Sequence, residues 1–175
     1  MSGKIQPHGS LSEYESNAVI EQEADQFASH LLMPSLRFIS VAQSVQLGLE
    51  GIRKIANHFG TSITASAVRY VKQELVPCAL LKWKDNELEW KWLSTEMFRA
   101  KFRSTIRSIA ELPDESATCE VVNMSIKTTE VVRKGSTAST WFRYISSDSL
   151  RNVILIEEVM SLGRFGALTF LYPAS

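Results

Sequence analysis

Glu23 is the residue of this sequence whose position most suggests chemistry, because a carboxylate there borders an apolar stripe. At 100° per residue, four apolar side chains fall within about 60° of one another on one helix face: Ile20, Ala24, Phe27 and Leu31. Glu23 lies about 40° from Phe27, at the edge of that stripe. A carboxylate in such a place loses hydration unless a cation compensates it. Glu23 is therefore either a metal ligand or a boundary carboxylate that reaches water or pairs with a lysine.

Two histidines are candidates to complete a metal site with Glu23. His30 is close to Glu23 in angle but lies roughly 10 Å further along the helix axis, so one straight helix cannot bring both to one ion. A metal at Glu23 therefore needs ligands from another segment. His30 also fits an ordinary half-buried surface histidine. His8 lies in the polar stretch QPHG and is either a bystander or a lone supplementary ligand.

The segment around Glu23, EQEADQFASHLLMP at residues 21–34, resembles the second motif of the ImmA/IrrE family of metallo-endopeptidases. In that family, two histidines of a preceding H-E-x-x-H helix bind zinc, its glutamate activates the bound water, and a glutamate of the second motif is the third protein ligand. The resemblance implies that Glu23 is this third ligand. Two imidazoles and one carboxylate leave zinc an open position for water, whose pKa falls to about 7. The family cleaves helix-turn-helix transcriptional repressors, so the resemblance also implies such a repressor as the partner.

The sequence departs from the family because it contains no H-E-x-x-H. Its histidines are His8, His30 and His58, and no two of them are four residues apart. One carboxylate cannot hold catalytic zinc, and hydrolysis needs a general base beside the zinc-bound water. We therefore expect this chain to be catalytically incomplete by itself, with no catalytic residue, and to retain no zinc. It is either a truncated product of a longer gene or a natural remnant that keeps the later parts of the fold.

Composition is that of an ordinary globular protein. The 175 residues suffice for one domain or a small pair, and 45% of them are hydrophobic, enough to bury a core. The net charge of zero gives no electrostatic case for nucleic acid or for an acidic membrane surface. No apolar run approaches the roughly 20 residues of a membrane span, and the polar start is not a secretory signal. Cys78 and Cys119 stand alone, so we expect a reducing compartment, the cytoplasm.

Hydrophobic periodicity predicts an α+β fold with a boundary near residue 76. Residues 1–75 have a helical pattern, with one helix from about 13 to 33 that Pro34 ends. Residues 76–175 have the pattern of an antiparallel sheet, beginning with a hairpin around Asp85 and Asn86. We expect a covering helix at 95–112. Further strands are expected at 118–126, 138–145, 152–160 and 166–172. The order of elements resembles small sensor modules of the GAF or PAS kind, an analogy that says little about a ligand.

Residues 49–75 have the texture of a helix-turn-helix. Gly60 is expected to end the first helix, and Thr61 or Ser62 to cap the second. Arg69 and Lys72 are the basic residues of the second helix and would be its nucleic-acid contacts. A helix that reads DNA presents more basic and amide groups than this one, so a three-helix packing unit beside the Glu23 helix is the favoured interpretation.

The hairpin is rich in tryptophan. With strict alternation, Trp90 and Trp92 share a face with Leu88, and that face is either core or the lining of a ligand pocket; core is favoured. Three functions follow from these observations. The first is an ImmA/IrrE-like homologue that lacks its catalytic helix. The second is a non-catalytic regulatory module that binds a repressor, another protein or a small molecule. The third is a DNA-binding regulator.

Overall fold

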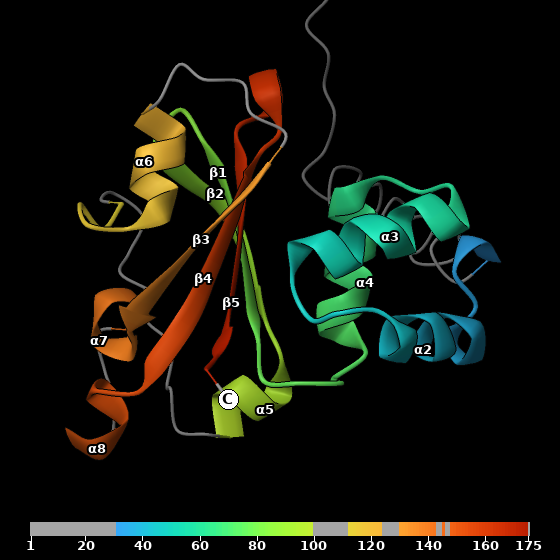
Figure 1. Ribbon diagram of the computed structural model, residues 1–175, viewed down its shortest axis with the longest axis horizontal. Coiled ribbons are helices and arrows are strands. Elements are labelled where there is room, and N and C mark those ends of the chain that lie inside the picture. Colours follow the sequence, from blue (N-terminus) through green and yellow to red (C-terminus); the bar gives the residue numbers. More distant parts are fainter. Residues whose placement is uncertain (1–30, 100–111, 124–129, 143–144, 146–147, 175) are drawn as a thin grey trace, which may run out of the picture.

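The computed structural model describes residues 31–99, 112–123, 130–142, 145 and 148–174. They form a five-stranded antiparallel sheet with helices packed on both of its faces, so the fold is mixed helix and sheet, as the sequence predicts (Figure 1). Helices α2 to α4 lie on one side of the sheet, and α6 and α7 on the other. No helix within these ranges has the length and apolar character needed to cross a bilayer.

The helices before the sheet are α2 at Ser35–Ser44, α3 at Leu49–Phe59 and α4 at Ile63–Lys72. The predicted turn between the last two is confirmed. Gly60 ends α3 with a left-handed φ of 63°, a conformation that glycine adopts without strain. Ser62 caps α4 by accepting a hydrogen bond from the Ala65 N–H at 3.1 Å.

The end of the predicted first helix is also confirmed. Leu31 and Leu32 are helical, and the chain leaves the helix at Met33, directly before Pro34. Proline disfavours a helical conformation in the residue before it, which explains this end. The earlier part of that helix, with Glu23, lies outside the described residues.

The strands are β1 at Ala79–Lys84, β2 at Glu87–Leu93, β3 at Val131–Thr137, β4 at Ile154–Ser161 and β5 at Ala167–Pro173. Their order in the sheet is β2-β1-β5-β4-β3, and every neighbouring pair is antiparallel. The predicted hairpin joins β1 and β2, and both Asp85 and Asn86 have a positive φ, as its tight turn requires. A short 3-10 helix, η1 at Gly163–Phe165, joins β4 and β5.

Two expected strands are wrong. The described part of 118–126 belongs to helix α6, Ala117–Asn123, which Ser116 caps by accepting a hydrogen bond from the Cys119 N–H at 3.0 Å. The strand expected at 138–145 lies earlier, as β3, and residues 138–141 form the short helix α7, Ala138–Trp141. β3 is an edge strand, so its sequence can be largely polar. The hydrophobic pattern that predicts a strand is therefore weak at these residues. The remaining short helices are α5 at Thr95–Arg99 and α8 at Asp148–Arg151.

Alternation along the hairpin is also interrupted. A register shift between Lys82 and Trp83 makes Leu88 the partner of Trp83, whereas Trp90 pairs with Lys82. Leu88 therefore packs in the core on the α6 side, and Trp90 packs in the core on the α3 side. The prediction that Leu88 shares a face with Trp90 is wrong, because a bulge reverses side-chain direction within one strand.

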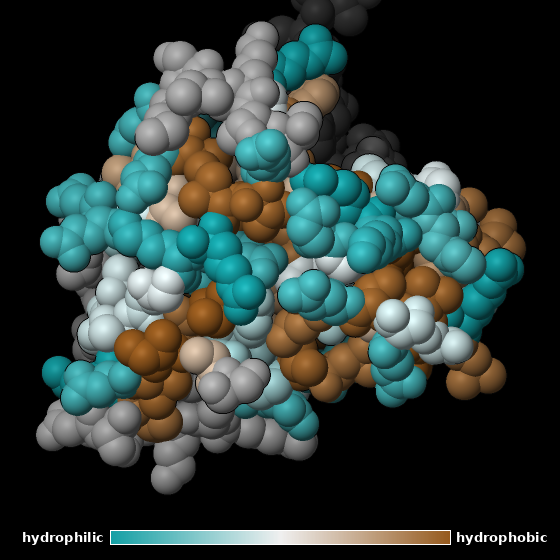
Figure 2. Space-filling model, in the orientation of Figure 1, coloured by the Kyte–Doolittle hydropathy of each residue, from teal (hydrophilic) through white to brown (hydrophobic). Residues whose placement is uncertain are grey.

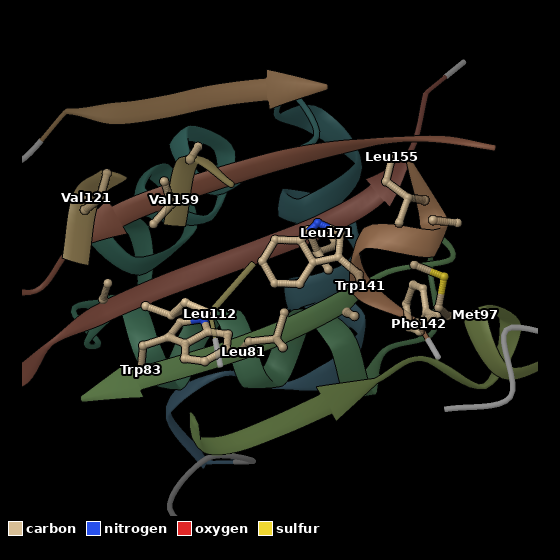
Figure 3. Packing of buried hydrophobic residues seen from close by; sticks show 14 of the residues in the cluster. Leu81, Trp83, Met97, Leu112, Val121, Trp141, Phe142, Leu155, Val159 and Leu171 are labelled. Carbon is tan, nitrogen blue, oxygen red and sulfur yellow. The ribbon is translucent and has the colours of Figure 1, made fainter. Parts of the chain in front are cut away.

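Each face of the sheet buries its own core. On the α6 side, Trp83, Trp141, Phe142 and Leu171 belong to one cluster of buried side chains (Figure 3). On the opposite side, α2, α3 and α4 share a second cluster with β1, β4 and β5. The helical region and the sheet are thus joined by a common hydrophobic core. Burial of apolar area at roughly 25 cal/mol per Å² makes such a core the main source of stability.

Candidate functional site

Met33, near the end of the family-like motif, is anchored in the helical unit. Its side chain is 1% exposed and belongs to the core cluster that α2, α3 and α4 share with the sheet. The Met33 sulfur lies 3.8 Å from the Thr61 hydroxyl and 3.8 Å from the Ser66 hydroxyl, and these two hydroxyls lie 2.7 Å apart. The last residue before Pro34 is therefore fixed against the start of α4.

Arg69 reinforces this anchor from the middle of α4. Its guanidinium donates to the Met33 carbonyl oxygen at 3.4 Å and to the Ser35 hydroxyl at 2.8 Å. Arg69 is 5% exposed, and burial lowers the pKa of its guanidinium from the ordinary value. Arginine is not deprotonated in proteins, so the group remains charged. Arg69 thus holds both sides of the Pro34 corner, where the chain passes from the motif helix into α2.

The two predicted nucleic-acid contacts, Arg69 and Lys72, lie in different environments. Arg69 is used inside the helical unit. Lys72 is exposed, and its ammonium lies 4.3 Å from the centre of the Trp92 ring on β2, a cation–π contact. The structure therefore does not bring the two basic groups together on an open helix face.

The predicted metal residues Glu23, His8 and His30 lie outside the described residues. Within the described ranges, no group of three or more His, Cys, Asp or Glu side chains is arranged to hold a metal ion. His58, on α3, is exposed, and its ring contacts Phe59 edge-on at 4.8 Å between centroids. A zinc site with three such protein ligands is therefore not present among the described residues.

Glu158 connects the helical unit to the sheet. This β4 residue is 6% exposed, and one carboxylate oxygen accepts a hydrogen bond from the Leu49 N–H, the first residue of α3, at 2.6 Å. The other oxygen accepts from the Tyr172 hydroxyl at 2.8 Å and lies 3.8 Å from the Arg133 guanidinium. A carboxylate at a helix N-terminus compensates the partial positive charge there. Glu158 thereby orients α3 on the sheet.

Glu157, the preceding residue, makes the equivalent contact on the opposite face. One of its oxygens accepts from the Thr118 N–H and from the Thr118 hydroxyl, both at 2.7 Å, at the start of α6. Burial raises the pKa of Glu157 from its usual value, although the Thr118 bonds, the Ala117 backbone N–H and Lys134 oppose this rise. The sequence places Glu157 and Glu158 beside a turn-prone region, but no periodic pattern distinguishes a buried carboxylate from an exposed one.

Gly48 is the sequence signal that could have revealed the contact with Glu158. Its φ is 122°, and an added Cβ would lie 2.3 Å from a Glu158 oxygen. Only glycine allows the backbone to approach a carboxylate so closely before a helix begins.

Comparison with known proteins adds no assignment. No protein-family model matches the chain, and no curated protein matches it significantly.

Proposed function

We propose that this chain is a relative of the ImmA/IrrE metallo-endopeptidases that anchors the Glu23 helix on a helical and sheet scaffold and is catalytically incomplete by itself. The observation that carries the proposal is the contact of buried Arg69 with Met33 and Ser35, at the end of the family-like motif. A metal ligand must be held within about 0.5 Å of its productive position by packing and by supporting hydrogen bonds. Arg69 fixes Met33 and Ser35, which follow the segment that would carry Glu23, and this supports the proposal.

Zinc in this family supplies a bound water that is acidic enough to act as a nucleophile near neutral pH. This chain would contribute only Glu23 to such a site, because it has no H-E-x-x-H. The histidine pair and the general base must come from another segment before hydrolysis can occur. The expected substrate is a helix-turn-helix repressor, and the expected compartment is the cytoplasm, which the free thiols of Cys78 and Cys119 suit.

The sheet supports a GAF- or PAS-like module as the second part of this protein. Its strands are antiparallel throughout, and helices cover both faces. Through Glu158 and the shared core, the helical unit that holds the motif rests directly on this module. A change in the sheet would therefore reach the motif helix through α3 and α4.

A test of this proposal compares the chain with a fusion that adds an H-E-x-x-H segment before residue 1, each purified with zinc. We expect the fusion to retain one zinc per chain and to cleave a helix-turn-helix repressor, with both properties lost on Glu23→Gln. The matched control is Glu50→Gln, which changes an exposed glutamate of α3. A fusion whose zinc content and cleavage do not depend on Glu23 would contradict the proposal.

A second candidate function is repressor binding without cleavage. Three leucines at the start of the described chain, Leu31, Leu32 and Leu36, are 68%, 56% and 87% exposed. Apolar side chains also reach the surface over the helical part of the molecule in Figure 2. Exposed apolar patches commonly mark protein contacts. Leu31→Glu with Leu36→Glu should then abolish binding of the repressor to this chain, whereas Gln43→Glu on α2 should not.

A further inference from the structure

The contact between α6 and the sheet includes a buried carboxylate, Glu157, whose hydrogen bonds within the described part of the chain reach one of its two oxygens. Glu157 is 0% exposed, and its Oε1 receives both Thr118 hydrogen bonds. The Thr118 hydroxyl donates to Glu157, so in its 2.7 Å contact with Thr169 it must accept. The Glu157 carboxylate therefore determines the direction of both hydrogen bonds: Thr169 donates to Thr118, and Thr118 donates to Glu157.

The second oxygen of Glu157 is different. Its Oε2 is buried and has no hydrogen-bond partner among the described residues. Glu158, one residue later, uses both of its oxygens, on Leu49 and Tyr172. A buried carboxylate oxygen without a donor carries the cost of lost hydration when the group is ionised, and this cost is smaller when the group is protonated and neutral.

The charges around Glu157 do not remove this cost. Lys134, on β3, pairs with Glu157 in the sheet register, but its ammonium is bound to Glu120 of α6 at 2.8 Å. Glu115, before α6, adds a further negative charge near Lys134. The neighbours of Glu157 on β5 and α6, Thr169 and Thr118, are uncharged. The one described cation facing Glu157 is thus already engaged by another carboxylate, in agreement with the raised pKa of Glu157.

We propose that Glu157 is a proton-operated latch for α6: protonated Glu157 holds the helix on the sheet more tightly than ionised Glu157 does. When α6 separates from the sheet, the Glu157 carboxylate regains water and its ordinary acidity. The docked form therefore binds the proton more strongly than the undocked form. By linkage, protonation must favour docking to the same extent.

The direction and the size of the effect follow from this linkage. As pH rises through the docked midpoint of Glu157, the proton leaves and docking weakens. The titration midpoint of Glu157 is higher in the docked form than in the undocked form. Each pH unit of this difference makes the docking equilibrium constant about tenfold smaller at a pH above both midpoints than at a pH below both. The inference does not depend on the proposed peptidase relationship, because it rests on α6 and the strands that surround Glu157.

The test uses the full chain and nuclear magnetic resonance. The Glu157 carboxyl carbon gives the midpoint directly, and amide hydrogen exchange at Thr118 gives the docking equilibrium, after correction for the intrinsic dependence of exchange on pH. We expect a midpoint above the ordinary value of 4.5 and a loss of Thr118 protection as pH rises through it. Leu49 is the internal control, since its N–H is held by the fully bonded Glu158 and should keep its protection.

Two variants decide the outcome. Glu157→Gln should remove the pH dependence of Thr118 protection, whereas Glu96→Gln, an exposed glutamate of α5, should leave it intact. If Glu157→Gln does not fold, Thr118→Val decides, because losing one donor to the ionised carboxylate should raise the midpoint further, and Thr118→Ser should restore it. A midpoint at or below 4.5, protection independent of pH, or a pH dependence that persists in Glu157→Gln would overturn the latch.

Discussion

Glu157 and Glu158 are neighbours on β4, and they hold the first turns of two different helices on opposite faces of the sheet. Glu157 accepts from the Thr118 N–H at 2.7 Å, and Glu158 accepts from the Leu49 N–H at 2.6 Å. Successive side chains of a strand point to opposite faces, so two adjacent carboxylates can serve both layers. This arrangement ties α6 and α3 to a single strand in the sheet.

Replacing Gly48 should show how much the contact between Glu158 and α3 stabilises the fold. Gly48→Ala puts a Cβ 2.3 Å from a Glu158 oxygen, and the backbone there has a φ of 122°. We expect a loss of about 2 kcal/mol or more in the free energy of unfolding, since both the backbone conformation and the carboxylate contacts suffer.

The matched control for this variant is Gly60→Ala. Gly60 also has a positive φ, of 63°, but nothing lies within 4 Å of its added Cβ. It should cost only the left-handed backbone penalty, about 1 kcal/mol. Urea denaturation of both variants measures the difference, and an equal cost for the two would show that Glu158 does not restrict Gly48.

Removing the guanidinium of Arg69 should loosen the Pro34 corner. Arg69→Met keeps the apolar stem but loses the donors to Met33 and Ser35, so we expect a destabilisation of about 1–3 kcal/mol. Lys72→Met, three residues further along α4, should cost less than about 1 kcal/mol, because it removes only an exposed cation–π pair. Chemical denaturation checks both. Equal effects would contradict an anchoring role for Arg69.

Alkaline pH should reveal the bond between Tyr172 and Glu158. Burial, and then the hydrogen bond and negative charge of Glu158, raise the pKa of Tyr172 from 10.0 to about 12. The folded state therefore keeps this proton between pH 10 and about 12, whereas the unfolded state loses it. Stability must fall as pH rises through that window.

Tyr172→Phe isolates this contribution, because burial raises the pKa values of Tyr70 and Cys78 as well. The free energy of unfolding should fall less steeply with alkaline pH in Tyr172→Phe than in the parent. Denaturant titrations at several pH values measure the two slopes. Identical slopes would mean that Tyr172 ionises as easily in the folded protein as in the unfolded chain.

DNA recognition through α4 should be absent. The Arg69 guanidinium is buried and donates to the Met33 carbonyl oxygen. The exposed residues of α4 include Ala65 and Lys72 but no cluster of basic groups. Specific DNA complexes weaken steeply with salt because phosphate contacts release counterions. A salt-dependent shift of a defined promoter fragment, lost in Arg69→Ala with Lys72→Ala, is the result that would refute this expectation.

The sequence predicts much of the fold where local signals are strong. The αL glycine Gly60, the cap at Ser62 and the turn at Asp85 and Asn86 act within a few residues, so they can be recognised without tertiary information. The position of α6 could not be recognised, because valines at 121 and 122 suggest a strand and the contact that favours the helix comes from Glu157, 39 positions away.

The candidate site also combines features that the sequence shows locally with contacts that only the folded structure shows. The motif around Glu23 is visible as a pattern, whereas the role of Arg69 is not, since a buried arginine and a DNA-contacting arginine look alike in one sequence. Its partners, Met33 and Ser35, lie 36 and 34 positions earlier. Only the packing of α4 against the Pro34 corner decides between the two roles.

The zinc content of the chain alone tests the central claim most directly. The protein, purified with zinc and dialysed against a weak chelator, should retain far less than one metal ion per chain, because Glu23 is the single ligand that the resemblance assigns. Elemental analysis gives the ratio. One zinc per chain, lost in Glu23→Gln or in His8→Ala and His30→Ala, would contradict the account and show that this chain builds a complete metal site of its own.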